Sequence, residues 1–484
     1  MISKWYDHLD HLDHLDHPDH LGHPDHLDHP GHLDHLDHLD HLDHPDHLGH
    51  PDHLDHPDHL DHPDHLDHPD HLDHPKLPIT NPKFRITYMP SLLLAYSGGL
   101  DTSFCIKYLS REKGYDVHTA IVDTGGFSPA EMQRIEQRAH ALGAKSFQVL
   151  DQVHPYYERC LKYLVFGNVL KNHTYPLSVS AERVFQALAL VAYAQQLGVR
   201  AIAHGSTGAG NDQVRFDLIF QTLAPDLEII TPIRDLSLSR EAEIDYLRQQ
   251  GVDFDFQKAE YSINQGLWGT SVGGKETLSS WDHLPDHAYP TPLTAREESE
   301  VHLHFEQGEL TGLNGQTYDH PVAALRALGE AAAPYAVGRD IHVGDTIIGI
   351  KGRVGFEAAA PLITLKAHEL LEKHTLGKWQ QYWKDQLGTW YGMLLHEGQF
   401  LDPVMRDIEA FLASSQRTVS GQVKVLLAPH RFTPAGIESP HDLMQAKFGT
   451  YGEANRAWTG EDVRGFTKIL ANAGKIYHSV NGEE

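Results

Sequence analysis

A glycine-rich string stands where a buried strand is expected to lead into a helix. The string AYSGGLDTS covers 95–103, after an apolar run at 91–96 and before a helix that the pattern predicts at 102–113. Gly98 and Gly99 allow a tight turn and let the backbone approach a ligand closely. Backbone amides at the start of a helix attract anions, and the hydroxyl groups of the string add hydrogen-bond donors. The string therefore predicts a phosphate-binding loop.

Asp101 is the residue of this string that a bare phosphate would repel. Its carboxylate indicates either a magnesium ion in the site or a structural cap on the following helix. A simple glycine turn, with Asp101 or Thr102 capping the helix, is the alternative interpretation of the whole string. The string is not a Walker loop, because neither GxxxxGKS nor GxxxxGKT occurs in the chain.

A second polar string follows a strand that is expected at 200–205. The string HGSTGAGNDQVRFD covers 204–217 and places an amide, a carboxylate and a guanidinium close together, at Asn211, Asp212 and Arg215. Asp212 can bind an ammonium group and Arg215 a carboxylate, so together they suit both charged ends of an amino acid. The alternative is a solvated loop in which Arg215 forms a surface pair with the aspartate that ends the string.

The expected elements alternate between strands and helices in the first part of the chain. This order predicts an α/β fold with a doubly wound, mostly parallel sheet, and ligands of such sheets bind at the carboxyl ends of the strands. Both polar strings should therefore meet at the same edge of the sheet. The expected strands are 91–96, 117–123, 146–150 and 200–205, and the expected helices are 102–113, 129–143 and 181–198.

Four parts of the chain differ in composition and in expected structure. They are a low-complexity tract at 1–76, a nucleotide-binding domain at 89–252, a second, α+β domain at 253–450 and a C-terminal helix segment at 451–484. A C-terminal helix of this kind packs either on a neighbouring subunit or on its own chain. In the later parts, strands are expected within 300–318, 340–350 and 421–429, and helices within 323–333, 362–387 and 460–473.

The low-complexity tract repeats His-Leu-Asp and His-Pro-Asp with a period of three. This period does not match a helix and the frequent proline disfavours a central strand, so we expect the tract to be disordered or loosely extended. Imidazoles beside carboxylates could buffer zinc, nickel or copper. The alternative, which we favour, is an expanded codon repeat ahead of a start at Met89.

The formal net charge of −28 is concentrated in this tract. Residues 1–75 hold 20 Asp and one Lys and so carry −19, which leaves −9 for the rest. This balance disfavours nucleic-acid binding, because a phosphate backbone needs a basic surface. Two cysteines, Cys105 and Cys160, are too few for a disulfide framework and favour a reducing cytoplasm. No apolar run is long enough for a membrane span, and no paired spacing predicts a zinc site.

The string at 95–103 resembles the pyrophosphate-binding loop of ATP pyrophosphatase-type (PP-loop) enzymes, which cleave ATP between the α and β phosphates. With the string at 204–217, it makes the chain from about Leu92 to Tyr477 similar to the argininosuccinate synthase family. The resemblance implies a nucleotide-binding domain like that of the adenine nucleotide alpha hydrolases, and a second, synthetase domain that takes part in multimerisation. It implies a cytoplasmic homotetramer of arginine biosynthesis. Such an enzyme uses ATP and Mg2+ to join L-citrulline and L-aspartate through citrullyl-AMP, with release of AMP and pyrophosphate.

The resemblance also implies roles for individual residues. Catalytic roles fall on Asp101, Asn211 and Arg215, and no protein nucleophile is required, so Cys105 is expected to be a packed core residue. The residues implied for ATP are Ala95, Tyr96, Ser97, Gly98, Gly99, Leu100, Asp101, Thr102, Ser103, Val122 and Gly205. The residues implied for citrulline and aspartate are Tyr175, Ser180, Arg183, Thr207, Asn211, Asp212, Arg215, Ser262 and Ser271.

The chain departs from the family pattern at and near the segment GIKGRVGFEAAAP, at 349–361. Familiar members have Glu at the position of Gly344 and Tyr at that of Phe356, and both contact citrulline there. Asp345 is adjacent and could replace the missing carboxylate. Ala209 stands where some members have Lys. These changes concern the citrulline contacts and leave the ATP and aspartate strings whole.

Two other functions are compatible with parts of the sequence. A tRNA-thiolating or tRNA-lysine ligase has the same kind of loop, but thiolation needs paired reactive cysteines and a basic RNA surface, and neither is evident. A histidine-rich metal-storage protein with a decayed ligase body would not retain the glycines and charged residues of both strings. Pyrophosphate release from ATP and citrulline, measured with and without aspartate, distinguishes these functions.

Overall fold

The computed structural model describes residues 89–252, 261–446, 448 and 457–482. The low-complexity tract at 1–76 lies outside the described residues, and with it the disorder and the metal binding considered for it. Residues 253–260, at the expected boundary between the two domains, also lie outside them.

The first part of the chain forms a five-stranded parallel sheet in the order β3-β2-β1-β4-β5. This order proceeds outward from β1 in both directions, which is the doubly wound arrangement that the sequence predicts. The strands are β1 Ser91–Ala95, β2 Asp116–Asp123, β3 Ser146–Asp151, β4 Ala201–Ala203 and β5 Glu228–Ile230. The helices are α1 Leu100–Arg111, α2 Pro129–Leu142, α3 Val153–Tyr156, the π-helical η1 Tyr157–Leu161, α4 Lys162–Phe166, α5 Ser178–Leu197, α6 Asp212–Leu223, α7 Pro232–Asp235 and α8 Arg240–Gln249.

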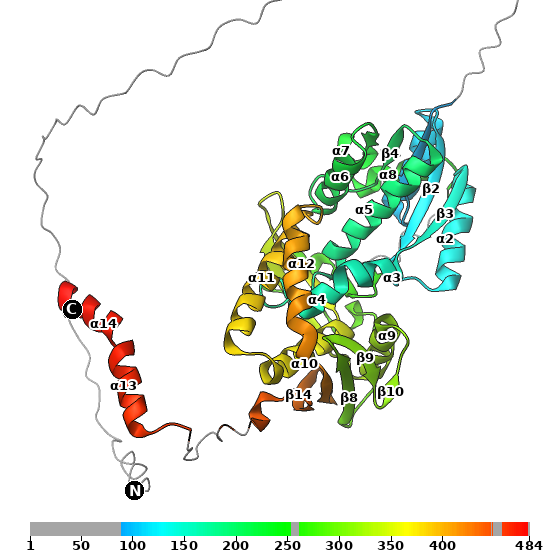
Figure 1. The fold of residues 1–484 in the computed structure, drawn as a ribbon. Coiled ribbons are helices and arrows are strands. Elements are labelled where there is room, and N and C mark those ends of the chain that lie inside the picture. The colour runs from blue at the N-terminus through cyan, green and yellow to red at the C-terminus, as the bar shows by residue number, and fades with distance from the viewer. Residues whose placement is uncertain (1–88, 253–260, 447, 449–456, 483–484) are drawn as a thin grey trace, which may run out of the picture. The chain divides into compact units, whose positions relative to one another are not determined.

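Helices cover both faces of this sheet (Figure 1). Leu92 and Leu94 of β1 are completely buried in a cluster with apolar residues of α1, α2 and α8. Leu93 points to the other face and is buried in a larger cluster that includes residues of α5. A parallel strand that is buried on both faces needs a continuous apolar run such as SLLLA. This packing fixes the carboxyl end of β1, where the glycine string begins.

The second part of the chain contains two antiparallel sheets, in the orders β10-β9-β8-β13-β14 and β11-β12-β7-β6. Four longer helices accompany them (Figure 1). The strands are β6 Ser262–Gly266, β7 Gly269–Gly273, β8 Ser299–Glu306, β9 Glu309–Leu313, β10 Gln316–Thr317, β11 Arg339–Asp345, β12 Lys351–Glu357, β13 Gly421–Ala428 and β14 Arg431–Glu438. The helices are α9 Pro321–Ala332, α10 Ala359–Thr375, α11 Lys378–His396 and α12 Pro403–Ser415, with short 3-10 turns η3 Lys275–Leu278, η4 Asp286–Ala288, η5 Ala333–Tyr335, η6 Gln416–Thr418 and η7 Leu443–Gln445.

Several expected helices have different bounds from those predicted. Helix α5, for example, begins at Ser178 and not at Ala181. The helical pattern at 362–387 belongs to two helices, because Leu376 is extended and Gly377 begins α11 as its N-cap. The pattern at 460–473 likewise spans α13 Gly460–Leu470 and the start of α14 Asn472–Asn481. Helix α1 begins at Leu100, directly after the glycines, and not at Thr102. A period of 3.6 continues across such breaks, so periodicity does not reveal them.

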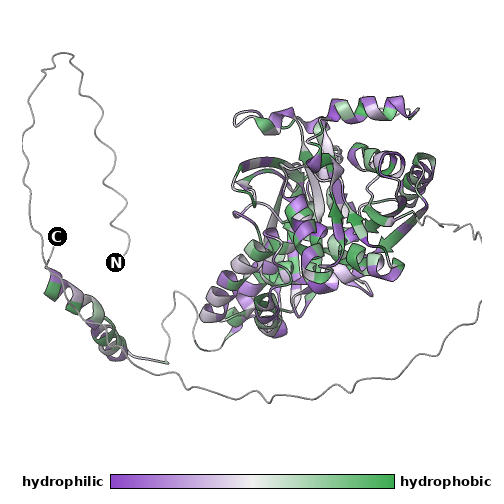
Figure 2. Cartoon of the chain, turned by 90° about the horizontal axis from the view of Figure 1, so that it is seen from above, coloured by the Kyte–Doolittle hydropathy of each residue, from purple (hydrophilic) through white to green (hydrophobic). Residues whose placement is uncertain are grey.

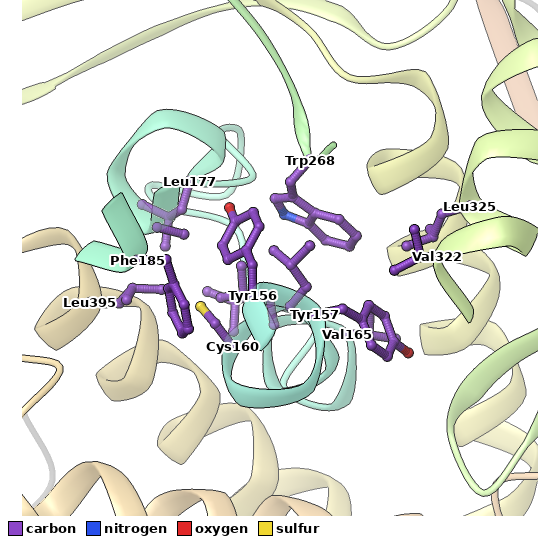
Figure 3. Close-up of a cluster of buried hydrophobic side chains, with 14 of the residues drawn as sticks. Tyr156, Tyr157, Cys160, Val165, Leu177, Phe185, Trp268, Val322, Leu325 and Leu395 are labelled. Carbon is purple, nitrogen blue, oxygen red and sulfur yellow. The ribbon is translucent and has the colours of Figure 1, made fainter. Parts of the chain in front are cut away.

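Trp268 joins the second part of the chain to the first. It lies in the turn between β6 and β7, is almost completely buried, and donates from Nε1 to the carbonyl of Pro176 at 2.8 Å. Figure 3 shows its ring between Tyr156 on one side and Val322 and Leu325 on the other. Side chains from both parts of the chain therefore share one core, and this core supports the segment that leads into α5.

Helices α13 and α14 expose apolar and polar side chains together, as their mixed colours in Figure 2 show. Among the residues that the structure describes, no helix has the length and apolarity needed to cross a membrane. The exposed apolar side chains of these two helices are Val463, Phe466, Ile469, Leu470, Ile476, Tyr477 and Val480.

Candidate active site

The glycine string forms the turn between β1 and α1. Gly98 is buried with φ of +76°, a left-handed conformation that favours glycine, and a Cβ there would lie 2.9 Å from Cγ1 of Ile135. Nη1 of Arg138 donates to the Gly98 carbonyl at 2.7 Å. Ser97 and Gly99, by contrast, are exposed. The loop is therefore packed on one side and open on the other.

The first turn of α1 is able to bind an anion. Gly99 is its N-cap, and no described side chain caps the helix. The hydroxyl of Thr102 instead lies 3.2 Å from that of Ser97 and donates to the Gly99 carbonyl at 3.5 Å. Capping by Asp101 or Thr102, the alternative interpretation of the string, is therefore wrong. Unpaired amides at a helix N-terminus attract phosphate groups.

The two polar strings meet at the carboxyl edge of the sheet, as predicted. Strands β1 and β4 are adjacent and parallel, so the segments that follow them leave the sheet side by side. A Cβ at Gly205 would lie 3.1 Å from Cγ2 of Thr102 and 3.3 Å from Cβ of Asp101. The absence of a side chain at Gly205 thus lets the second string lie directly against the first.

Asp101 has a second carboxyl group beside it, that of Glu243 on α8. Glu243 is almost completely buried. Burial, together with the Asp101 carboxylate, raises the pKa of Glu243 to about 8, and burial also raises the pKa of Asp101. Such a pair retains a proton or attracts a cation near neutral pH. Cys105 is completely buried nearby and burial raises the pKa of its thiol, so it is a packed core residue as predicted.

Asp212, at the start of α6, is the centre of an ion-pair network. Its carboxylate oxygens accept hydrogen bonds from Nε of Arg183 at 2.9 Å and from Nη1 of Arg215 at 3.0 Å. Burial alone would raise the pKa of Asp212, but the two guanidinium groups outweigh burial and hold this pKa below its usual range. Nη2 of Arg183 also donates to Oδ1 of Asn264 at 3.1 Å. Asp212 therefore holds the side chains of Arg183 and Arg215 in place in addition to carrying a negative charge.

Arg215 is almost completely buried, with 2% of its surface exposed. Its Nε and Nη2 donate to the carbonyl of His396 at 3.1 and 3.0 Å, and Nη2 also donates to Oγ of Ser180 at 3.0 Å. The alternative of a surface pair between Arg215 and Asp217 is wrong, because Asp217 pairs with Arg234 at 2.7 Å. Arg215 joins α6 to the end of α11 and orients Ser180 at the start of α5.

Comparison with known proteins distinguishes between the enzymes that have such a loop. The family described as "Arginosuccinate synthase N-terminal HUP domain" matches residues 91–253, and "Arginosuccinate synthase C-terminal domain" matches residues 261–477. The chain belongs to the argininosuccinate synthase family. The argininosuccinate synthase of Xanthomonas campestris is 39% identical over 404 residues, which cover 81% of this chain and 98% of that protein. Those of Dictyoglomus turgidum and Methanocaldococcus jannaschii are both 35% identical, covering 81% and 75% of this chain and 98% and 91% of their own lengths.

The residues implied for the two amino acids by the argininosuccinate synthase family are only partly gathered around this network. Tyr175 is buried with its ring centroid 5.1 Å from that of His342 and 5.4 Å from that of Phe356. Ser271 is buried on β7 and pairs in register with Phe356 of β12. Asn211 is half-buried, and its Oδ1 accepts from the backbone amide of residue 347 at 2.8 Å. Thr207 and Ser262 are exposed.

The residues that the family implies for ATP also differ in exposure. Ser97 and Gly99 are exposed and Asp101 is half-buried, so these three border the open side of the loop. Ser103 is completely buried, so its hydroxyl is withdrawn from that side. The remaining residues support the loop from the strand ends and the core: Ala95, Tyr96, Gly98, Leu100, Thr102, Val122 and Gly205.

Gly344 and Asp345 are in β11, where the chain departs from the argininosuccinate synthase pattern. A Cβ at Gly344 would lie 2.6 Å from Nε2 of His342, so the imidazole occupies the space that a side chain at 344 would need. Asp345 points to the opposite face of the strand from Gly344, because side chains alternate along a strand. Asp345 is exposed and pairs with Lys351 at 2.6 Å. This placement argues against Asp345 as a replacement for the missing carboxylate.

Four polar residues of the site were not predicted from the sequence. Glu182 accepts a hydrogen bond from Oγ1 of Thr124 at 2.6 Å, and burial raises its pKa to about 7. Glu182 directly precedes Arg183, so its position was a usable signal. The position of His396 was not, because it is 181 residues from Arg215 at the end of an ordinary helix. The four residues are Glu182, Glu243, His342 and His396.

Proposed function

We infer that the chain is an ATP-dependent ligase that joins L-citrulline and L-aspartate to form argininosuccinate, with release of AMP and pyrophosphate, in arginine biosynthesis. One observation supports this most strongly: an uncapped helix start and a charged network suited to amino acids lie at the same edge of a parallel sheet. The first can bind the phosphates of ATP and the second the two amino acids, so all three reactants are brought together.

The chemistry requires an activated ureido group. The ureido oxygen of citrulline attacks the α-phosphorus of ATP, which forms citrullyl-AMP and releases pyrophosphate. The amine of aspartate then attacks the ureido carbon and expels AMP. The first-turn amides of α1 would stabilise the departing pyrophosphate. Holding the reactants in place would supply much of the rate enhancement.

We propose the following roles for the residues of the site. The exposed part of the loop, with Asp101, faces ATP. Asp212 receives the ammonium group of aspartate, while Asn211 and Arg215 orient the reacting amino acids. Arg215 acts largely through Ser180 and Asp212, because most of its donors are already bound within the protein. The further substrate residues proposed are Tyr175, Arg183, Thr207, Ser262 and Ser271.

We propose that Mg2+ accompanies ATP. Within the described residues, no group of three or more His, Cys, Asp or Glu side chains is placed to hold a metal by itself. The carboxyl pair of Asp101 and Glu243 nevertheless fits a hard cation, because it offers oxygen ligands and has a raised pKa that a cation would lower. Asp101 would hold the ion together with phosphate oxygens. A bound Mg2+ would neutralise charge on the phosphates.

A homotetramer in the cytoplasm is also proposed. The exposed apolar side chains of α13 and α14 would be covered by a neighbouring subunit, which supports an oligomer. Both cysteines are buried free thiols, which suits a reducing compartment. The division into a nucleotide-binding domain at 89–252 and a synthetase domain at 253–450 remains a prediction.

The purified protein is expected to release pyrophosphate only when ATP, magnesium, citrulline and aspartate are all present. AMP should appear in equal amount, because this loop class cleaves ATP after the α-phosphate. Coupled detection of pyrophosphate with chromatography of the nucleotides measures both products. Formation of ADP and phosphate would contradict the proposed function.

A chain that begins at Met89 is expected to have the same melting temperature and specific activity as the full chain. The first strand begins at Ser91, and the carbonyl of Pro90 accepts from the amide of Asp116 at 3.0 Å, so this start retains the first described contacts of the sheet. Both chains should be compared in the presence of a chelator. Affinity for nickel or zinc should be lost with the tract. Aggregation or inactivity of the shorter chain would show that the tract has a structural role.

A further inference from the structure

Two histidines beside the citrulline residues each have a buried ring nitrogen without a hydrogen-bond partner in the described part of the chain. The nitrogens are Nδ1 of His342 and Nε2 of His396. Buried polar atoms are nearly always paired in native proteins, so unpaired ones at the edge of an active site indicate a missing ligand. Neither histidine belongs to the glycine string or to the second polar string.

The tautomer of His396 follows from its neighbours. Its Nδ1 lies 3.4 Å from Nη2 of Arg215 and 3.2 Å from Oγ of Ser180. The two protons of Nη2 go to the His396 carbonyl and to Oγ of Ser180, which leaves the Ser180 hydroxyl proton for Nδ1. Because Nδ1 accepts this proton and also faces a cation, the single proton of the neutral ring is on Nε2. The ring is neutral because burial, then Arg215 and Lys171, lower the pKa of His396 to about 3. The backbone of Asp345 is close enough to the ring to raise this pKa slightly, but Nε2 makes no hydrogen bond within the described residues. Nε2 is therefore a buried donor that needs an acceptor.

His342 lies on the same side of the site as His396, since its charge would act on the His396 ring. Its ring stacks on Tyr175, which precedes Ser180 by five residues at the start of α5. Burial, then Lys171, lower the pKa of His342, so this ring is also neutral. A neutral imidazole that has no other partner can carry its proton on Nδ1 and donate from there. Lys171 has no ion-pair partner in the described ranges, and its Nζ donates only to Sδ of Met393, at 3.9 Å. The nearby carboxylate of Asp345 is exposed and is neutralised by Lys351.

The charge of this region determines which end of a substrate it suits. Within the described residues, the phosphate loop contacts Ile135, Arg138, Gly205 and Glu243, and no contact joins it to either histidine. The ureido group must reach the α-phosphorus at the loop, so the α-carbon end of citrulline points away from it. That end carries an ammonium and a carboxylate. Two neutral donors near a lysine ammonium that has no ion-pair partner favour the carboxylate.

We propose that His342 and His396 bind the α-carboxylate of citrulline and thereby determine which ureido compound the enzyme accepts. This assignment rests on the proposed function. The assignment explains why the two ring nitrogens have no partner within the protein, since they would bind the carboxylate. It also explains the glycine at 344, which leaves room for the His342 ring. Tyr175 and Ser180 hold the two imidazoles in place.

Citrulline and its neutral C-terminal amide, citrullinamide, distinguish this role from a structural one. The wild type is expected to prefer citrulline by at least about a hundredfold in kcat/KM, the effect of a charge-assisted contact with a carboxylate. His396→Asn keeps an acceptor near the Nδ1 position but lacks the Nε2 donor, and His342→Phe keeps the stacked ring but lacks both nitrogens. Each change should reduce the preference about tenfold, by raising KM for citrulline and not those for ATP and aspartate.

His396→Gln is the matched variant, because its amide can donate from near the Nε2 position. It should recover most of the preference that His396→Asn loses. If the ring only supported Ser180 and Arg215, the order would be reversed, with Asn the better substitute. His441→Gln, at an exposed position, controls for the loss of a histidine.

The possible outcomes separate the two proposals. An active wild type whose preference for citrulline is unchanged in His342→Phe and His396→Asn would overturn the carboxylate assignment and leave the proposed function intact. A wild type that binds ATP but releases no pyrophosphate with citrulline and aspartate would overturn the proposed function, and this assignment with it.

Discussion

Gly99→Val is expected to abolish ATP binding in a protein that still folds. Gly99 has φ of −79° and ψ of 179°, which any residue adopts, and a Cβ there meets only Oγ of Ser97, at 3.4 Å. The valine methyl groups would instead occupy the open side of the loop, over the first-turn amides of α1. The Kd for ATP should rise by at least about a hundredfold, because losing one ionic contact alone costs about tenfold or more. Calorimetric titration measures this Kd, and thermal melting confirms folding.

Two further glycine variants serve as controls for this result. Gly436→Val adds the same side chain at an open position of β14 and should leave both ATP affinity and the melting temperature unchanged. Gly98→Val should instead lower the melting temperature, because Gly98 has a positive φ and its Cβ would collide with Ile135. Unchanged ATP affinity in Gly99→Val would show that the phosphates bind elsewhere.

Asp212→Asn is expected to raise KM for aspartate by about 10- to 100-fold, as the loss of a charge-assisted hydrogen bond predicts. KM for ATP should change little, because the Asp212 carboxylate is bound by Arg183 and Arg215 and not by the glycine string. The amide can accept from one guanidinium, but its NH2 group would face the other. Steady-state kinetics with each substrate varied in turn measures the three KM values.

Asp217→Asn is the matched control for this prediction. Asp217 is on the same helix, α6, and its carboxylate is also paired, with His204 and Arg234. Its loss should lower stability without a selective effect on aspartate. An equal rise in the KM values for ATP and aspartate in Asp212→Asn would indicate that Asp212 is structural only.

The parallel sheet could be predicted because its signals are local. SLLLA is a continuous apolar run that ends in two glycines, and this pattern suits a strand buried on both faces. The break between α10 and α11 was missed because the apolar pattern continues through the buried Leu376, although Gly377, directly after it, is a residue type that often marks a helix end.

The candidate site was predictable to the extent that its residues are close in sequence. Asp212 and Arg215 are three residues apart, and their ion pair was not foreseen although their chemistry was. The hydrogen bond from Arg215 to the His396 carbonyl involves a backbone atom. Every residue type has this carbonyl, so the residue at 396 does not predict the bond. His342 is only two residues before Gly344, but its relevance depends on the ring stacking on Tyr175, which only the fold brings near.

The bond between Arg215 and the end of α11 has a consequence for how such a chain can be divided. The parallel-sheet half holds a buried guanidinium that is bound by a carbonyl of the other half. A replacement half that covered Arg215 without placing a carbonyl at this point would leave the cation buried with two of its donors unmet, which is costly. The nucleotide-binding half is therefore poorly suited to serve as an exchangeable module. If the nucleotide-binding halves of two relatives were exchanged, the end of α11 would have to be transferred together with that half.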